Sequence, residues 1–273
     1  MNSLPSPPAA PPGQAPAQPE RPACRVAGPG DARNILALHR AAFQRGVHRY
    51  SIYRHGHGVA TYLAELLGGS PPNHVFYVAE DGGRCVGYGH FLRGDGFSHL
   101  NYVAVDGRRR GLGIASRLFG LWEADAALTP GASLRLDVST WDHLALAWYR
   151  RRGFSQVSET RVYRLRKRRG PVPPYRVLDA QEADRRHAAF GFSQLQVQLE
   201  GHTWTVGRVS DRYFRITDPP SGDLVASLQH LDPHRNIIFL GETALPEGWG
   251  RLEDVLLRLE RTQGDQADAG HRT

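Results

Sequence analysis

The feature that most constrains the fold is a strand, a glycine-rich turn and a helix that follow one another directly. Residues 98–105 (SHLNYVAV) have the pattern of a β-strand, and residues 116–128 (SRLFGLWEADAAL) carry apolar side chains at helical spacing. The turn between them contains Arg110-Gly111-Leu112-Gly113-Ile114-Ala115. A strand that passes into a helix in this way is typical of α/β proteins, in which helices cover a sheet.

Further strands and helices alternate along the same part of the chain. Residues 74–80 and 84–92 have the pattern of two strands joined by a hairpin turn of composition Asp-Gly-Gly. Residues 134–138 alternate as a strand does, and residues 143–152 have a helical pattern that ends at Gly153, a natural C-terminal cap. This order predicts an α/β layer structure with crossover helices.

Proline-rich stretches divide the 273-residue chain into two globular pieces. Residues 1–23 are dominated by proline and alanine, and a segment of that composition is expected to be disordered or polyproline-like. A second proline-rich run, RRGPVPP, would interrupt any helix or central strand. The sequence therefore predicts one domain at residues 24–168, a linker at 169–174, a second domain at 175–262 and a polar tail at 263–273.

The two pieces also resemble each other in sequence. Three stretches of the first have counterparts in the second, in the same order: residues 25–32 with 176–183, 76–91 with 213–231, and 100–123 with 237–260. We therefore expect a duplicated module whose second copy lacks the segment that corresponds to residues 134–154.

Charge and composition limit the classes of partner. The net charge is +7, and basic residues outnumber acidic ones up to residue 170, whereas acidic residues outnumber basic ones beyond it. The first piece therefore suits an anionic partner such as a phosphorylated cofactor or a nucleic acid. No apolar run approaches the length of a membrane span, and the N-terminus lacks the pattern of a signal peptide, so we expect a cytoplasmic protein without a membrane partner.

Metal and disulfide sites are not expected. Cys24 and Cys85 are too few and too far apart in sequence for a disulfide framework or a cysteine-ligated metal. His55-Gly56-His57 has no carboxylate or cysteine at a usual ligand spacing, which favours a loop on the substrate side over a metal site.

The glycine-rich turn carries the clearest indication of chemistry. Glycine lets the backbone approach a ligand closely, and the N-terminus of a helix presents unpaired N–H groups with a partial positive charge. The stretch from Arg110 to Ala115 therefore predicts a pyrophosphate cradle, with Arg108 and Arg109 adding positive charge beside it. The alternative is a turn that merely starts a helix. The stretch is neither a Walker loop nor a dinucleotide fingerprint.

These residues resemble the GNAT superfamily of acetyl-CoA-dependent N-acetyltransferases. The family signature, Arg/Gln-x-x-Gly-x-Gly/Ala between a strand and a helix, is present here as Arg110-x-x-Gly113-x-Ala115. A second family block is matched by residues 136–154, which end in Tyr-x-x-x-Gly-Phe. The resemblance covers residues 24–166. It implies a mixed central sheet with flanking helices, followed by a truncated second GNAT-like module, and transfer of an acetyl group from acetyl-CoA to a primary amine.

The resemblance also assigns a cofactor site. The backbone amides of Gly111 to Ala115, Leu112 and Ile114 included, would hold the pyrophosphate of acetyl-CoA. The edge of the strand at Val103 and Val105 would pair with the pantetheine arm, as a peptide adds to a sheet. Asp142 stands where the family commonly has an asparagine that contacts pantetheine. An ionised aspartate can only accept hydrogen bonds, so that contact is open.

The same resemblance assigns proton carriers. Tyr149 falls on the usual general acid, which protonates the departing thiolate. His99 occupies the position where several histone acetyltransferases of the superfamily have a glutamate base, and a histidine titrates in the useful range. Glu80 is the competing base, acting directly or through water. The structural alternatives are a strand histidine at position 99 and a core aromatic residue at position 149.

The second copy is expected to bind no cofactor. In the alignment of the two pieces, Glu247 replaces Arg110 and Trp249 replaces Leu112, so negative charge would lie where the pyrophosphate lies in the first copy. Its expected role is to complete the sheet or to cover the acceptor site of the first copy. Two other functions stay open: a non-catalytic protein that binds or senses acyl-CoA, and a nucleic-acid-binding protein.

Overall fold

The computed structural model describes residues 22–262, apart from residues 70, 128–130 and 169. The polar tail at 263–273, most of the proline-rich N-terminal segment and Arg169 of the predicted linker lie outside the described residues.

One mixed 12-stranded sheet runs through both halves of the chain. The strands in spatial order are β1, β2, β3, β4, β5, β12, β6, β11, β10, β9, β8 and β7. Two pairs of neighbours are parallel, β4 with β5 and β10 with β11, and the other pairs are antiparallel. The mixed α/β fold class predicted from the sequence is therefore confirmed.

The first half contributes β1 (Ala23–Val26), β2 (His74–Asp81), β3 (Arg84–Gly94), β4 (Phe97–Val105), β5 (Ser133–Ser139) and β6 (Ser155–Leu165). The second half contributes β7 (Arg176–Val177), β8 (Phe192–Leu199), β9 (His202–Val209), β10 (Tyr213–Ile216), β11 (Asn236–Gly241) and β12 (Gly250–Thr262). The helices are α1 (Ala32–Ala42), α2 (Ile52–His55), α3 (Val59–Leu67), α4 (Ile114–Ala126), α5 (His143–Arg150), α6 (Ala180–Phe190) and α7 (Gly222–Leu231). Short 3-10 turns are η1 (Pro29–Asp31), η2 (Gly46–Tyr50) and η3 (Gly107–Arg109).

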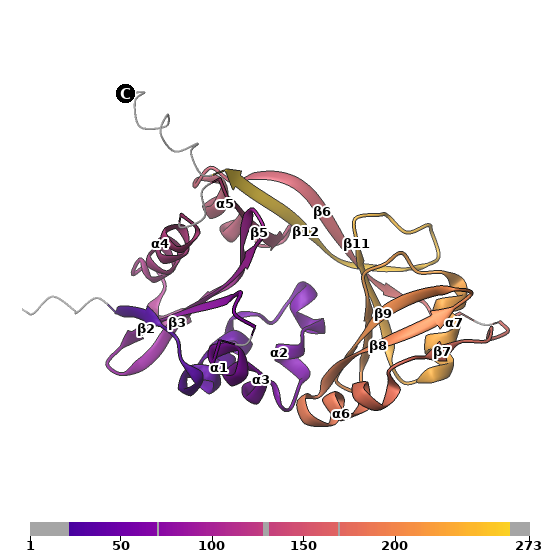
Figure 1. Ribbon diagram of the computed structural model, residues 1–273. Helices are drawn as coiled ribbons and strands as arrows, with labels where there is room; N and C mark the ends of the chain where they lie inside the picture. Colours follow the sequence, from indigo (N-terminus) through magenta and orange to yellow (C-terminus); the bar gives the residue numbers. More distant parts are fainter. Residues whose placement is uncertain (1–21, 70, 128–130, 169, 263–273) are drawn as a thin grey trace, which may run out of the picture.

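Helices cover both faces of the sheet in the first half (Figure 1). On one face α4 and α5 pack on β3, β4 and β5 around the fully buried side chains of Phe119 and Trp122. The Trp122 indole N–H donates to Ser98 Oγ at 2.7 Å, which satisfies the polar atom of this buried ring. On the other face α1 and α3 pack on β2 and β3 around Ile35 and Tyr88.

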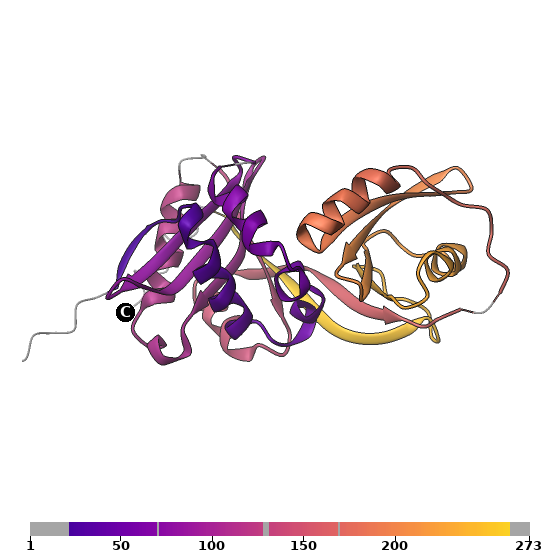
Figure 2. The ribbon, with the colours of Figure 1, turned by 90° about the horizontal axis from the view of Figure 1, so that it is seen from below.

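The last strand of the chain lies within the sheet of the first half. β12 separates β5 from β6, with Leu257 opposite Val138 on β5 and opposite Glu159 on β6. Leu257 and Leu259 are buried in the core of the first half. Figures 1 and 2 show β6 and β12 as two long curved strands that run from one half to the other. Residues 250–262, which the sequence assigns to the second module, thus complete the first.

The second half repeats the order of the first, but not in the alignment that the sequence suggested. The match of residues 25–32 with 176–183 agrees with the structure, since each stretch is a strand followed by a helix. The other two matches are wrong. Residues 213–231 form β10 and α7 rather than a hairpin, and residues 250–260 belong to a strand rather than to a helix like α4.

The correct correspondence comes from topology. In each half a strand runs parallel to the next strand of the sheet, and a helix connects the two: β4, α4 and β5 in the first half, β10, α7 and β11 in the second. Gly111 and Gly113 lie just before α4, and Gly248 and Gly250 lie at the start of β12; this similarity produced the wrong alignment. Beyond Gly250, however, Val255, Leu257 and Leu259 recur at every second position, which is the period of a strand.

Candidate active site

The site begins where two parallel strands separate. β4 pairs with β5 only from Phe97 to Leu100. The next residue, Asn101, is skipped in the pairing of β4 with β3, where Phe91 faces Leu100 and His90 faces Tyr102. Beyond this bulge β4 stays on β3 and no longer pairs with β5. The edge of residues 101–105 that faces β5 is therefore free of strand pairing.

The bulge is held by a side chain. Asn101 Nδ2 contacts His90 Nδ1 at 3.0 Å, and the His90 ring is stacked on Phe76 with centroids 3.9 Å apart. His90 is buried, and burial lowers its pKa well below the usual range, so the neutral ring can accept from the amide. A polar residue at a strand bulge thus fixes the point at which β4 and β5 separate.

The glycine-rich turn lies at the end of the unpaired part of β4. Gly111 and Gly113 have φ of +80° and +74°, in the left-handed region that favours glycine. Gly113 is the N-cap of α4 and offers no side-chain cap. In the described part of the chain, the backbone N–H groups of residues 111–116 have no hydrogen-bond partner. The turn therefore presents a set of free donors at the positive end of a 13-residue helix.

The arginines of the turn differ in their partners. Arg109 forms an ion pair with Asp81 at 2.7 Å, whereas Arg110 is exposed. Val103 and Val105, predicted to border the cofactor, pack with Ile114 and Leu118 of α4. The strand edge and the turn are thereby fixed to the same helix.

Asp142 and Tyr149 lie on α5, which follows β5. Asp142 caps this helix, because its carboxylate accepts from the Ala145 N–H at 3.1 Å. Tyr149 is buried, and its ring lies against Trp148 with centroids 5.1 Å apart. Burial raises the pKa of Tyr149 above its ordinary value, and the charge of Asp142 adds to this effect. The phenol therefore keeps its proton near neutral pH.

An arginine that the sequence motifs did not single out joins α5 to α4. Arg152 donates to Ser116 Oγ at 2.9 Å, in the first turn of α4, and its guanidinium lies 3.5 Å from the centre of the Trp148 ring. The sequence signal is slight, since Arg152 is one of three consecutive arginines before Gly153.

His99 lies at the point of separation, on the face opposite α4. Its Nε2 is 3.8 Å from Asp137 Oδ2 on β5, and Asp137 accepts two hydrogen bonds of 2.9 Å from Arg258 on β12. Burial lowers the pKa of His99, and the Asp137 charge partly opposes this effect. A neutral imidazole next to the separation can accept a proton.

Glu80 is not brought to the same place. It faces Cys85 across the β2–β3 hairpin and is paired with Arg25 at 2.5 Å. His99 faces Leu92, seven residues further along β3 than Cys85, which corresponds to about 20 Å of strand. This position does not suit a base acting at the separation of β4 and β5.

Two further polar groups lie on the face that carries α1. His48, in η2, packs against Phe43 and Tyr102 with ring centroids 4.5 and 6.0 Å apart. Asp254 of β12 accepts from Ser139 Oγ at 2.7 Å and from the Val47 N–H at 2.8 Å. The sequence did not point to either residue. For Asp254 the reason is that its contact with Val47 joins residues 207 positions apart and leaves no local pattern.

Comparison with known proteins assigns this part of the chain to a family. The model of the acetyltransferase (GNAT) family matches residues 35–154, which include β4, the glycine-rich turn and α5. The first half of the chain is a GNAT acetyltransferase domain. Members of this family transfer an acyl group from acetyl-CoA, and the resemblance stated from the sequence is confirmed. No curated protein matches the chain in sequence.

Solved structures share the fold of this chain over most of its length. A putative acetyltransferase from Pyrococcus horikoshii is 13% identical, covers 89% of each chain and superposes with a TM-score of 0.62. A tandem GNAT protein from the clavulanic acid biosynthesis pathway is 13% identical, with 88% and 98% of the two chains covered and a TM-score of 0.62. A GCN5-related N-acetyltransferase from Sphaerobacter thermophilus is 15% identical, with 89% and 96% covered and a TM-score of 0.56.

The GNAT-like second half differs from the GNAT domain at the equivalent position. All four residues of β10 remain paired with β11, so these strands do not separate. The connection to α7 contains Pro219 and Pro220, which have no N–H, and Ser221 Oγ accepts from the Leu224 N–H at 3.0 Å. Glu247 and Trp249, expected at this position, instead lie in the segment between β11 and β12.

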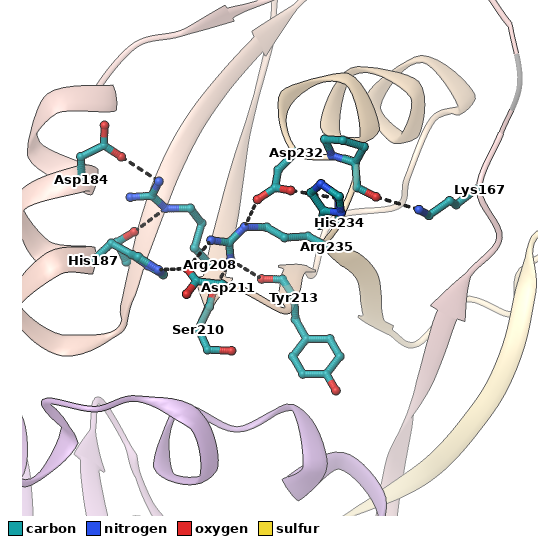
Figure 3. Close-up of polar contacts among 12 residues, drawn as sticks. Lys167, Asp184, His187, Arg208, Ser210, Asp211, Tyr213, Asp232, His234 and Arg235 are labelled. Atoms are coloured by element: carbon teal, nitrogen blue, oxygen red, sulfur yellow. Dashed lines mark hydrogen bonds and ion pairs between the residues drawn. The ribbon is translucent and has the colours of Figure 1, made fainter.

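A polar network stiffens the second half where it faces the GNAT domain (Figure 3). Arg235 is 6% exposed and binds Asp232 at 2.7 Å and Asp211 at 3.2 Å. In Figure 3 the Tyr213 side chain points from this network toward the helices of the GNAT domain. There its ring meets Tyr50 of η2 edge-on, with centroids 5.1 Å apart.

The remaining sequence features have structural explanations. His57, of the histidine pair considered as a metal motif, contacts the Ala188 carbonyl at 2.9 Å and so joins the two halves. Among the described residues, no group of three or more histidine, cysteine or acidic side chains is placed to bind a metal ion. No helix within the described ranges has the length and apolar character needed to cross a bilayer.

Proposed function

We propose that the chain is an N-acetyltransferase that moves the acetyl group of acetyl-CoA to a primary amine by direct attack in a ternary complex. The main support for this proposal is that an unpaired strand edge and a turn with free N–H groups lie next to each other. A strand edge left unpaired beyond Asn101 leads directly to a turn whose N–H groups, from residue 111 to residue 116, have no partner in the described chain. A ligand with an amide-rich arm and a diphosphate matches both features.

In this proposal the backbone binds the donor. The amides of Gly111, Leu112, Gly113, Ile114 and Ala115 hold the pyrophosphate, and Arg110 adds mobile positive charge. The amide groups of pantetheine pair with the β4 edge at Val103 and Val105. The Asp142 carboxylate already caps α5, so its role is to orient that helix rather than to bind pantetheine.

His99 acts as the base. The acceptor arrives largely as an ammonium ion, which has no lone pair for attack, and His99 takes its proton. The free amine then forms a C–N bond with the carbonyl carbon of the thioester. Asp137, held by Arg258, faces the His99 ring and stabilises the imidazolium that results.

Tyr149 acts as the acid. As the tetrahedral intermediate collapses, the C–S bond breaks, and the sulfur leaves with the bonding electron pair. Tyr149 donates its proton to that sulfur, which its raised pKa permits because the phenol is still protonated at neutral pH. The nitrogen then loses its surplus proton, which restores the Tyr149 phenol, and the His99 imidazolium releases its proton to water. The products are the amide, free CoA and one proton.

The second half supports the GNAT domain instead of binding a second cofactor. Three observations favour this role: β10 and β11 do not separate, two prolines remove N–H donors before α7, and Ser221 satisfies the helix terminus. Its contribution to the reaction is structural, through β12 and through the contact of Tyr213 with η2.

The test is acetyl transfer by the intact chain. Acetyl-CoA is supplied with a panel of primary amines comprising small amines, aminoglycosides, amino acids and peptides with free N-termini. Release of CoA thiol and mass spectrometry of the acetylated amine are followed together. We expect thiol release that depends on one class of amine and matches the amide formed. Binding of acetyl-CoA without transfer to any amine in the panel would support a binding or sensing protein instead.

A further inference from the structure

Asp254 is a buried carboxylate whose partners are all neutral. It is 6% exposed and lies next to an irregularity of β12, where the pairing with β6 shifts between Leu252 and Asp254. Its oxygens accept from Ser139 Oγ, from the Val47 N–H and from the Val255 N–H, at 2.7 to 2.9 Å. In the described part of the chain it forms no ion pair with arginine, lysine or histidine.

The turn against Asp254 is shaped to receive this carboxylate. Gly46 has a φ of +59°, and a Cβ at this position would overlap Asp254 Oδ2 and lie 2.7 Å from Trp141 Nε1. Only glycine fits there without displacement. The first residue of η2 thus lets the chain approach a carboxylate supplied by the last strand of the protein.

The same turn carries His48, on the face of the sheet that is covered by α1. The His48 ring lies near Tyr102, the residue that follows the Asn101 bulge, and thus near the separation of β4 and β5. Charged and titratable groups face it from three elements: Asp254 from β12, Asp142 from the start of α5 and His39 from α1. Burial lowers the pKa of His48, and the two carboxylates oppose that effect.

We propose that Asp254 is a positioning residue for the acceptor amine: from the last strand it holds the turn Gly46–Tyr50 so that His48 faces the separation of β4 and β5. The inference rests on the proposed function and deepens it, since the acceptor side of the GNAT domain is then complete only with a strand from the second half. Asp254 acts on the acceptor through this turn and not by direct contact, because its oxygens already accept from Ser139, Val47 and Val255.

The adjacent residue offers a matched control. Glu253 is also poorly exposed, but it is paired with Arg251 at 2.6 Å and with Arg164 at 3.3 Å. It also accepts a hydrogen bond from the Tyr50 hydroxyl of the same turn, and the amide oxygen of a glutamine can keep that bond. Glu253→Gln and Asp254→Asn each remove one negative charge from the same segment of β12 and keep the size of the side chain. If this segment only holds the fold together, the two variants will behave alike.

The kinetic experiment compares these variants in the intact chain. With a fixed amine, Asp254→Asn should raise the KM for the amine about tenfold or more, as expected when the charge-assisted hydrogen bond from the Val47 N–H that holds the turn is weakened, and should leave the KM for acetyl-CoA within about twofold. Glu253→Gln should leave both KM values within about twofold of the parent. Equal effects of the two variants on the amine KM, or no effect of Asp254→Asn, would overturn the proposal.

A second readout does not depend on turnover. The imidazole of His48, assigned with the variant His48→Gln, is titrated by NMR in the intact chain. Because the Asp254 charge favours the imidazolium, Asp254→Asn should lower the pKa of His48, and Glu253→Gln should not. An unchanged His48 titration would overturn the inference. If the parent chain acetylates no amine, the proposed function fails, while this titration still decides whether Asp254 controls the turn.

Discussion

At the scale of single residues, the proposed reaction depends on groups that the fold places before any ligand binds. Gly113 keeps a left-handed conformation at the start of α4, and Tyr149 and His99 keep protonation states set by burial. The sequence motif led directly to these three residues. It could not show Asn101 or Asp254, because their roles depend on strand pairing and on a contact over a long sequence separation.

Gly113→Ala should weaken acetyl-CoA binding about fivefold or more. An alanine in the left-handed region costs about 1–2 kcal/mol, so the turn relaxes and its N–H groups lose their common direction. Isothermal titration with acetyl-CoA measures the change. Gly120→Ala is the matched control, since Gly120 lies within α4 with open space at its Cβ position. It should leave affinity unchanged and raise stability by about 0.5–1 kcal/mol. Unaltered binding in Gly113→Ala would contradict the cradle.

Tyr149→Phe should reduce kcat by about 100-fold or more while changing the dissociation constant of acetyl-CoA by less than about twofold. The substitution removes only the hydroxyl, which has no hydrogen-bond partner in the described part of the chain, and keeps the ring contacts with Trp148 and Phe154. Steady-state kinetics and the melting temperature are measured together. A variant with parental kcat would exclude Tyr149 as the acid.

The pH dependence of kcat/KM should identify His99. The active form is the neutral imidazole, so activity falls as the pH drops through the pKa of His99, which burial places below the ordinary value of a histidine. Asp137 opposes that lowering, and Asp137→Asn should therefore move the acidic limb to still lower pH. Glu159→Gln, which alters the ion pair with Arg161 on β6, should leave the limb in place. A limb that stays or moves upward in Asp137→Asn would exclude this base.

At the scale of elements, the sequence predicted strands and helices well where their periods are clean. The β2–β3 hairpin, β4, α4, β5 and α5 all lie where alternation and helical spacing indicated. The predicted match of residues 100–123 with 237–260 is wrong because both stretches contain a pair of glycines, while the apolar residues after each pair recur with different periods. α4 has apolar residues at helical spacing, whereas β12 alternates at Val255, Leu257 and Leu259. Comparing the spacing of apolar residues in the two stretches is enough to find this difference. The bulge at Asn101, by contrast, has no pattern in the sequence that predicts it.

At the scale of the whole molecule, the two halves share one sheet, and neither set of strands is complete without the other. β12 is hydrogen-bonded on both sides, to β5 and to β6, and it brings Asp254 to Ser139 and Arg258 to Asp137. From the other side, Tyr213 supports η2. The order of elements along the sequence cannot reveal this arrangement, since the last strand of the chain lies beside the sixth.

A chain that ends at Trp249 should therefore lose the GNAT domain's cooperative unfolding and its acetyl-CoA binding. Without β12, the edges of β5 and β6 are unpaired, and two buried leucines worth about 1.5–3 kcal/mol each are absent from the core. A chain that ends at Thr262 keeps every described strand and should behave as the full chain does. Calorimetric unfolding of both chains makes the comparison. Undiminished acetyl-CoA binding by the shorter chain would contradict the shared sheet.

The stoichiometry of acetyl-CoA binding to the intact chain, measured by isothermal titration, tests the proposed cofactor site most directly. We expect one molecule per chain, bound at the turn from Arg110 to Ala115 and weakened by Gly113→Ala. No binding at all, two equivalent molecules per chain, or one molecule held equally well by the Gly113→Ala variant would contradict it.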